Sequence, residues 1–241
     1  METDMQVSAR AVDATVARKL LLIWQDPATR VFRRVGELDE LEDGLFTFRY
    51  LDDAADATFS PLAQFPDLGR VYGPGPLPSF FRNRIMSKSR DSYGEYRGWL
   101  GLNDDGMDTP AEVLLRTGGS RATDTFHVVD DLSRASDGRI QSRFFASGIR
   151  YLAGAGALLL ALQPGQELSL RDEADNLYNP RAVLIDAARG EPVGYVPDWL
   201  LDDLHDLRHR ADELSIFAEQ INPEAPSHLK LLCRIEAIVA P

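Results

Sequence analysis

Short alternating runs of apolar and polar residues dominate the first half of the chain. Within residues 20–51, Asp26-Pro27 separates two apolar runs, a pattern that predicts a hairpin. Phe46, Phe48 and Tyr50 then occupy every second position, which is typical of a strand. Five prolines between residues 59 and 78 exclude regular structure throughout that stretch.

Two helices are signalled by residues that favour helix ends. Ser92 and Glu95 have the spacing of a capping box and predict a helix that begins there. Thr109-Pro110 followed by Glu112 predicts a second helix, with Thr109 as the N-cap and Glu112 reaching back to it. Gly118-Gly119 is expected to end this helix, because glycine accepts the left-handed backbone conformation.

The second half of the chain has mainly the pattern of strands. Strands are predicted over residues 144–152, 168–171, 182–185, 192–196, 214–221 and 229–239. Leu200, Leu204 and Leu207 recur at helical spacing and predict one amphipathic helix. In the last strand Cys233 falls on the apolar face, so we expect it in the core rather than in a reactive role.

These elements predict an α+β protein of two domains. A polar, turn-rich segment over residues 130–138 separates them. We expect a mobile tail over residues 1–18, a mixed strand and helix domain over 19–130, a linker over 131–139, and a small OB-like β-barrel with one amphipathic helix over 140–241. Small β-barrels of this kind often bind oligonucleotides.

Composition narrows the choice of partners. The 241 residues include 26 Lys+Arg and 38 Asp+Glu, a net charge of -12, which excludes a generic nucleic-acid coat protein but not a local basic patch. Two candidate phosphate patches are Arg134, Arg139, Arg143 and Arg150, and Arg82, Arg84, Lys88 and Arg90. The single cysteine excludes an internal disulfide framework. The single cysteine fits a reducing compartment, and the longest apolar run, 152–162, is too short to span a membrane, so we expect a cytoplasmic protein without membrane contact.

No catalytic constellation is recognisable in the sequence. His205 and His209 have i,i+4 spacing, but no H-E-x-x-H is present and the pattern fits a solvated helix face. The glycines at 118–119 lack the spacing of a phosphate-binding loop. We therefore predict a protein that is not an enzyme and needs no metal or cofactor.

Three motifs in the second half occur in a characteristic order. They are Gly148-Ile-Arg-Tyr151, then Asn176-x-Tyr178-Asn179-x-x-Ala182, then Gly194-Tyr-Val196. Together they resemble the HIRAN domain over residues 140–240, a family found fused to remodelling helicases and nucleases and also alone in bacteria. The resemblance implies a modified OB-type barrel that captures the 3′ end of single-stranded DNA.

The resemblance also implies roles for individual residues. Tyr151 and Tyr178 would sandwich the terminal base, and base stacking on an aromatic ring contributes roughly 1–3 kcal/mol. Arg150 would contact a phosphate, because arginine is a planar and permanently charged donor. Asn176 and Asn179 would hydrogen-bond the sugar end, and Phe217 would complete the aromatic wall.

Two departures from the family pattern weaken the expected site. Asn179 stands where the end-binding members have Asp, so charge-assisted hydrogen bonding is lost. Acidic residues follow the third motif at Asp198, Asp202, Asp203 and Asp206, and they would repel phosphates if they lie near the groove. The alternative that Tyr151 and Tyr178 are ordinary aromatics at the rim of a barrel stays open.

The first half resembles a different family. The stretches FTFRYLDD, FSPLAQFPDL, LPSFFRNRIMSKSRDSY and VLLRTGGSRATDTF are similar to the small N-terminal subdomain of HipA-type toxin kinases. No kinase body is recognisable, so the resemblance implies a docking or recognition module over residues 19–130.

Three functions follow from these patterns. The first is a non-enzymatic, bacterial reader of single-stranded DNA 3′ ends that recruits a protein partner through residues 19–130. The second is a protein-interaction or toxin-antitoxin-like regulatory module that does not bind DNA. The third and weaker alternative is a hydrolase-associated DNA-processing factor.

Overall fold

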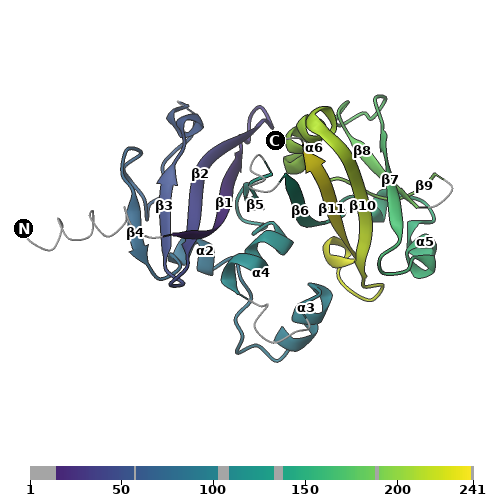
Figure 1. The fold of residues 1–241 in the computed structure, drawn as a ribbon, viewed down its shortest axis with the longest axis horizontal. Coiled ribbons are helices and arrows are strands. Elements are labelled where there is room, and N and C mark those ends of the chain that lie inside the picture. The colour runs from purple at the N-terminus through teal and green to yellow at the C-terminus, as the bar shows by residue number, and fades with distance from the viewer. Residues whose placement is uncertain (1–14, 57, 103–108, 133–137, 188–189, 240–241) are drawn as a thin grey trace, which may run out of the picture. The chain divides into compact units, whose positions relative to one another are not determined.

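A computed structural model describes residues 15–56, 58–102, 109–132, 138–187 and 190–239. The chain divides into two compact units, Met1–Ser87 with Thr109–Asp131, and Lys88–Asp108 with Leu132–Pro241. The structure is a mixed α+β fold whose strands pair antiparallel throughout the described residues (Figure 1).

The first unit is built on a five-stranded sheet with the order β4-β3-β2-β1-β5 (Figure 1). Its elements are β1 (Val16–Gln25), β2 (Phe32–Leu41), β3 (Phe46–Tyr50), η1 (Asp52–Ala55), β4 (Tyr72–Gly75), α2 (Ser79–Arg82), α4 (Pro110–Thr117) and β5 (Phe126–Asp130). The predicted hairpin is confirmed, because β1 and β2 pair on either side of residues 26–31. The Asp26 carboxylate closes this turn by accepting from the Ala28 N–H at 2.8 Å. The strand expected at 46–50 is also confirmed.

The core of the first unit is rich in aromatic rings. Phe48 is 1% exposed, and its ring centroid lies 4.4 Å from Phe65 and 5.6 Å from Phe81. The rings come from β3, from the proline-rich connection and from α2, so one cluster joins three segments that are distant in the sequence. Side chains of α4 pack into the same cluster.

The two helix predictions differ in their outcome. Thr109 caps α4 by accepting from the Glu112 N–H at 3.2 Å, and Gly118 ends the helix at φ 67°. The Glu112 carboxylate does not reach back to the cap, because it accepts from Arg116 at 2.6 Å and from Arg18 at 2.5 Å. A helix does follow Ser92, but the Ser92 side chain makes no capping hydrogen bond, so the predicted capping box is wrong.

The second unit is built on a six-stranded sheet with the order β6-β11-β10-β7-β8-β9. Its elements are α3 (Tyr93–Trp99), β6 (Arg139–Phe145), η2 (Ile149–Tyr151), α5 (Ala155–Ala161), β7 (Glu167–Asp172), β8 (Val183–Ala187), β9 (Glu191–Tyr195), η3 (Asp198–Leu200), α6 (Leu201–Arg210), β10 (Ala211–Ile221), η4 (Ser227–Leu229) and β11 (Leu231–Val239). The predicted amphipathic helix is α6, which buries Leu201, Leu204 and Leu207.

The expected OB-like barrel is only partly present. Strands β6 and β9 lie at opposite ends of the sheet order, and the ends approach at one isolated bridge between Ser147 and Tyr195. Two backbone hydrogen bonds of 2.8 and 2.9 Å form this bridge. The observed architecture is therefore a six-stranded antiparallel sheet with a single bridging contact, rather than a barrel closed by a continuous ladder.

The strand predicted over residues 144–152 is wrong beyond Phe145. The chain turns at Gly148, which has φ 67°, and continues as the short helix η2. The apolar run that follows forms α5, a helix that the sequence pattern did not predict. The expectation for Cys233 is met, since its side chain is fully buried and burial raises the pKa of the thiol.

The predicted domain limits differ in detail from the two compact units. Strand β1 begins at Val16, inside the predicted tail, and residues 1–14 lie outside the described part of the chain. Most of the predicted linker, residues 133–137, also lies outside it. The segment Lys88–Asp108 groups with the second unit, where the Asn222 amide donates to the Trp99 carbonyl at 2.8 Å.

Candidate nucleic-acid interface

The first and third motifs meet at the bridge between Ser147 and Tyr195. A Cβ atom at Gly148 would lie 2.7 Å from Cδ2 of the Tyr195 ring, and a Cβ atom at Gly194 would lie 2.8 Å from Cβ of Ala146. Both glycines are therefore required for close packing, and Gly148 also for its positive φ. This contact fixes the start of η2, the helix that presents Arg150 and Tyr151.

Arg150 and Tyr151 form an exposed pair. The Tyr151 side chain is 73% exposed. The Arg150 guanidinium lies over its ring, with Cζ 4.6 Å from the ring centroid and Nη2 2.5 Å from the hydroxyl oxygen. Within the described part of the chain, Arg150 makes no ion pair with a carboxylate. The pair combines an exposed aromatic ring with a positive charge that no acid of the described residues neutralises.

Other arginines of the same unit are neutralised by acids. Carboxylates pair with Arg143, Arg171, Arg181, Arg208, Arg210 and Arg234. The Arg171 partner, Asp186, is 2% exposed, so that pair belongs to the framework of β7 and β8. Arg150 is thus distinguished from these six residues by its electrostatic surroundings.

The second motif forms a tight turn between β7 and β8. The Asn176 Oδ1 accepts from the backbone N–H groups of Tyr178 and Asn179, each at 3.0 Å. Its Nδ2 donates to the Glu173 carboxylate at 2.5 Å, and the Asn179 Oδ1 accepts from the Arg181 N–H at 2.9 Å. Both asparagines therefore shape the turn itself. The turn projects Tyr178, whose side chain is 96% exposed.

Tyr195 connects the turn to the η2 loop. Its ring packs on Gly148, and burial together with a hydrogen bond to Glu173 raises the pKa of its hydroxyl. Glu173 in turn accepts from Asn176. Tyr195 was not among the predicted site residues, although the third motif contained it. Its position gives that motif a structural reason, because one side chain contacts both loops that carry the exposed tyrosines.

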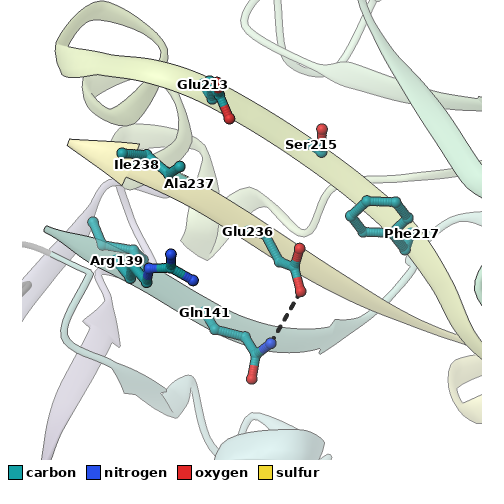
Figure 2. Close-up of a pocket in the computed structure, with 9 residues that line it drawn as sticks. Arg139, Gln141, Glu213, Ser215, Phe217, Glu236, Ala237 and Ile238 are labelled. Carbon is teal, nitrogen blue, oxygen red and sulfur yellow. Dashed lines mark hydrogen bonds between the residues drawn. The ribbon is translucent and has the colours of Figure 1, made fainter. Parts of the chain in front are cut away.

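Phe217 lies in different surroundings. It points outward from β10 and lines a hollow of about 470 Å³ over β6, β11 and β10 (Figure 2). The Arg234 guanidinium lies 4.8 Å from its ring centroid. Other side chains of this hollow include Gln141 and Glu236, whose hydrogen bond of 3.1 Å crosses from β6 to β11. A shared aromatic wall of Phe217 with the two tyrosines stays a prediction.

Two of the acidic residues after the third motif contact the turn. The Asp198 Oδ1 accepts from the Asn179 amide at 3.2 Å, and the Asp202 carboxylate pairs with Arg181. Asp206 instead pairs with Arg210 at 2.8 Å on the same helix, and Asp203 is buried. The acidic stretch therefore does lie at the candidate site, through Asp198 and Asp202.

The predicted phosphate patches are only partly available. Arg84 is 7% exposed and pairs with Asp124 at 2.7 Å while donating to the Gly119 carbonyl, so it is a structural residue of the first unit. Arg143 pairs with Glu219 at 2.5 Å, and Arg134 lies outside the described residues. Unlike Arg84 and Arg143, Arg150 pairs with no carboxylate of the described residues, so its charge is available to a ligand.

Two further features bear on the candidate chemistry. Among the residues that the structure describes, no group of three or more His, Cys, Asp or Glu side chains is arranged to hold a metal ion. In the same part of the chain, no helix has the length and apolar character to cross a membrane. The His205 Nε2 lies 3.3 Å from the Arg181 carbonyl oxygen, which places it beside the turn.

Comparison with known proteins identifies the second half of the chain. Residues 141–239 match the family model of the HIRAN domain, so this part of the chain is a HIRAN domain. Because the match begins at residue 141, it does not bear on the resemblance of residues 19–130 to the HipA subdomain, which stays a prediction.

Two solved structures are similar to the chain at low sequence identity. A protein from Lactobacillus plantarum is 17% identical over 43% of this chain and 100% of its own, with a TM-score of 0.33. The HIRAN domain of human HLTF is 14% identical over 44% of this chain and 83% of its own, with a TM-score of 0.32. A search of the curated proteins finds no match.

Proposed function

We propose that the HIRAN domain of this protein binds the 3′ end of single-stranded DNA without catalysing a reaction on it. Tyr151 and Tyr178 provide faces on which bases stack, and Arg150 contacts a backbone phosphate. The HIRAN match and the exposure of both tyrosines support this proposal. A protein normally buries aromatic rings of this size, so a side chain that is 96% exposed is available to a partner.

The observation that supports the proposal most directly is the pairing of Arg150 with Tyr151. A guanidinium lying over an exposed ring offers a nucleotide both a charge for its phosphate and an aromatic face for its base. In the described part of the chain no carboxylate competes for this guanidinium. A purely structural arginine would instead be expected to resemble Arg171, which is paired with the buried Asp186.

The asparagines have a modified role in this proposal. Asn176 holds the turn through both ends of its amide, so we assign it to positioning Tyr178 rather than to contact with the sugar. Asn179 donates to Asp198 through an exposed hydrogen bond of 3.2 Å. That donor can exchange Asp198 for the 3′ hydroxyl of a strand. Recognition of the end then depends on Asn179 rather than on both asparagines.

A net charge of -12 limits the manner of binding. Each phosphate contact on a single strand contributes about 0.7 to the slope of log affinity against log salt concentration. A site with one or two phosphate contacts therefore has modest affinity and a shallow salt dependence. End capture satisfies this condition, whereas coating of a long strand does not.

The direct test is fluorescence anisotropy with the full chain and labelled single strands. One strand carries a free 3′ hydroxyl, a second carries a 3′ phosphate, and a third is a blunt duplex of the same sequence, each at two salt concentrations. We expect binding of the free 3′ end, weaker binding of the blocked end, and the weakest binding of the duplex. Equal and negligible binding of all three would refute the proposal.

A further inference from the structure

We propose that Arg181 is a second phosphate-binding residue of this site and that Asp202 sets the affinity for DNA by competing for it. This inference rests on the proposed function, because it concerns the same strand. It assigns a role to an arginine outside the predicted site and to an acid that the sequence indicated only as a source of repulsion.

Arg181 occupies a fixed place next to the candidate site. It follows Asn179 by two residues, and its backbone N–H donates to the Asn179 Oδ1 at 2.9 Å. Its carbonyl oxygen lies 3.3 Å from the His205 Nε2 on α6. The backbone at this position is thus attached to both the turn and the helix, and the side chain leaves it from the turn that projects Tyr178.

The side-chain partner of Arg181 is weakly held. Its guanidinium pairs with the Asp202 carboxylate, and the two side chains are 54% and 66% exposed. Ion pairs between exposed side chains contribute little to stability, because water solvates both charges well when they separate. The guanidinium can therefore leave Asp202 without disturbing the backbone contacts that hold the turn.

A phosphate is a suitable replacement for the carboxylate. Arginine binds both groups with the same planar arrangement of donors, so exchange of one oxyanion for the other preserves its hydrogen bonds. Exchange breaks the ion pair between Arg181 and Asp202, and the loss of this pair lowers the affinity of the site for the strand. Asp198 acts in the same direction through the Asn179 amide.

Asp206 provides a matched control on the same helix. It is also 66% exposed and also pairs with an arginine, but its partner is Arg210 on α6 rather than a residue of the turn. Asp202→Asn and Asp206→Asn change the net charge equally. Any difference between them in DNA affinity therefore reports the place of the acid rather than the total charge.

The experiment measures strand affinity by anisotropy over a series of salt concentrations for four variants of the full chain. These are Asp202→Asn, Asp206→Asn, Arg181→Gln and the double variant Asp202→Asn/Arg181→Gln. We expect Asp202→Asn to tighten binding roughly two- to fivefold at low salt and to steepen the salt slope by up to about 0.7. Asp206→Asn is expected to change affinity less than twofold. In the Arg181→Gln background, Asp202→Asn is expected to lose its effect.

The outcomes separate this inference from the proposed function. If the wild-type chain binds the strand but both aspartate variants tighten binding equally, only total charge matters and the inference is wrong. Weaker binding by Asp202→Asn, with an unchanged thermal melting curve, would show that Asp202 positions the turn, which also overturns it. If neither the wild type nor Asp202→Asn binds at any salt concentration, the proposed function itself fails and the inference fails with it.

Discussion

The two units of this protein use aromatic residues in opposite ways. In the first unit, Phe48, Phe65 and Phe81 pack ring against ring inside the core, each at most 3% exposed. In the second unit, Phe144 is the one aromatic residue of the buried core cluster, which is otherwise aliphatic apart from Cys233. Tyr151 and Tyr178 of that unit are instead 73% and 96% exposed. One residue class thus stabilises the first fold and is presented to solvent by the second.

The difference shows why the second unit can present its tyrosines. Its core contains side chains from all six strands and from α5 and α6, so folding does not require the exposed rings. The tyrosines lie on η2 and on the β7–β8 turn, where Gly148 and Asn176 shape the backbone. Four predictions, in order of decreasing effect, test this contrast.

Phe48→Ala should destabilise the chain most. The side chain is 1% exposed and packs against the rings of Phe65 and Phe81, so its loss removes buried apolar area and leaves a cavity. The expected loss in the free energy of unfolding is about 3–5 kcal/mol. Chemical denaturation followed by circular dichroism measures it, and Phe48→Leu should lose less. A loss below about 1 kcal/mol would contradict the role of the aromatic core.

Tyr151→Ala and Tyr178→Ala should affect binding rather than stability. Each should weaken binding of a single strand by roughly 1–3 kcal/mol through lost stacking. Leu177→Ala is the matched control for Tyr178→Ala, since Leu177 is 95% exposed on the same turn. We expect the leucine variant to bind like the wild type. Anisotropy titrations measure the affinities, and unchanged affinity in both tyrosine variants would place the site elsewhere.

His127 should make the free energy of unfolding of the first unit depend on pH in the acid range. Burial, and then the nearby charge of Arg84, lower the pKa of His127 to about 4 in the folded chain, from 6.5. The unfolded chain therefore binds the proton first, and stability falls as the pH drops from 6.5 through 4. We expect a loss of up to about 2 kcal/mol, because the imidazole is not fully buried. Denaturation midpoints at several pH values should show a weaker dependence for His127→Gln, and an equal dependence would contradict the assignment.

Arg150→Gln should produce the smallest effect. Loss of one phosphate contact lowers the salt slope by about 0.7 and weakens binding a few-fold at low salt. Arg143→Gln is a suitable control, because Arg143 is already paired with Glu219 at 2.5 Å. The salt dependence of anisotropy distinguishes the two variants. Equal slopes would remove the distinction between Arg150 and the paired arginines.

Much of the fold was predictable because its signals are local. The Asp26-Pro27 hairpin, the Thr109 cap and the strand pair β10–β11 follow from turn chemistry, capping chemistry and alternation with a period of two. Residues 146–152 were not predicted correctly, because their apolar pattern is compatible with either strand or helix. The turn at Gly148 ends the strand, and its close contact with the Tyr195 ring joins residues that are 47 positions apart.

The residue order along the chain is enough to reveal the HIRAN motifs, the amphipathic helix and the net charge of -12. Which charged groups face the site depends instead on how the chain folds. Arg150 and Arg181 look alike in the sequence, but α6 brings Asp202 to the second and no carboxylate of the described residues to the first. Ion pairs depend on distances across the fold, which residue spacing along the chain does not determine.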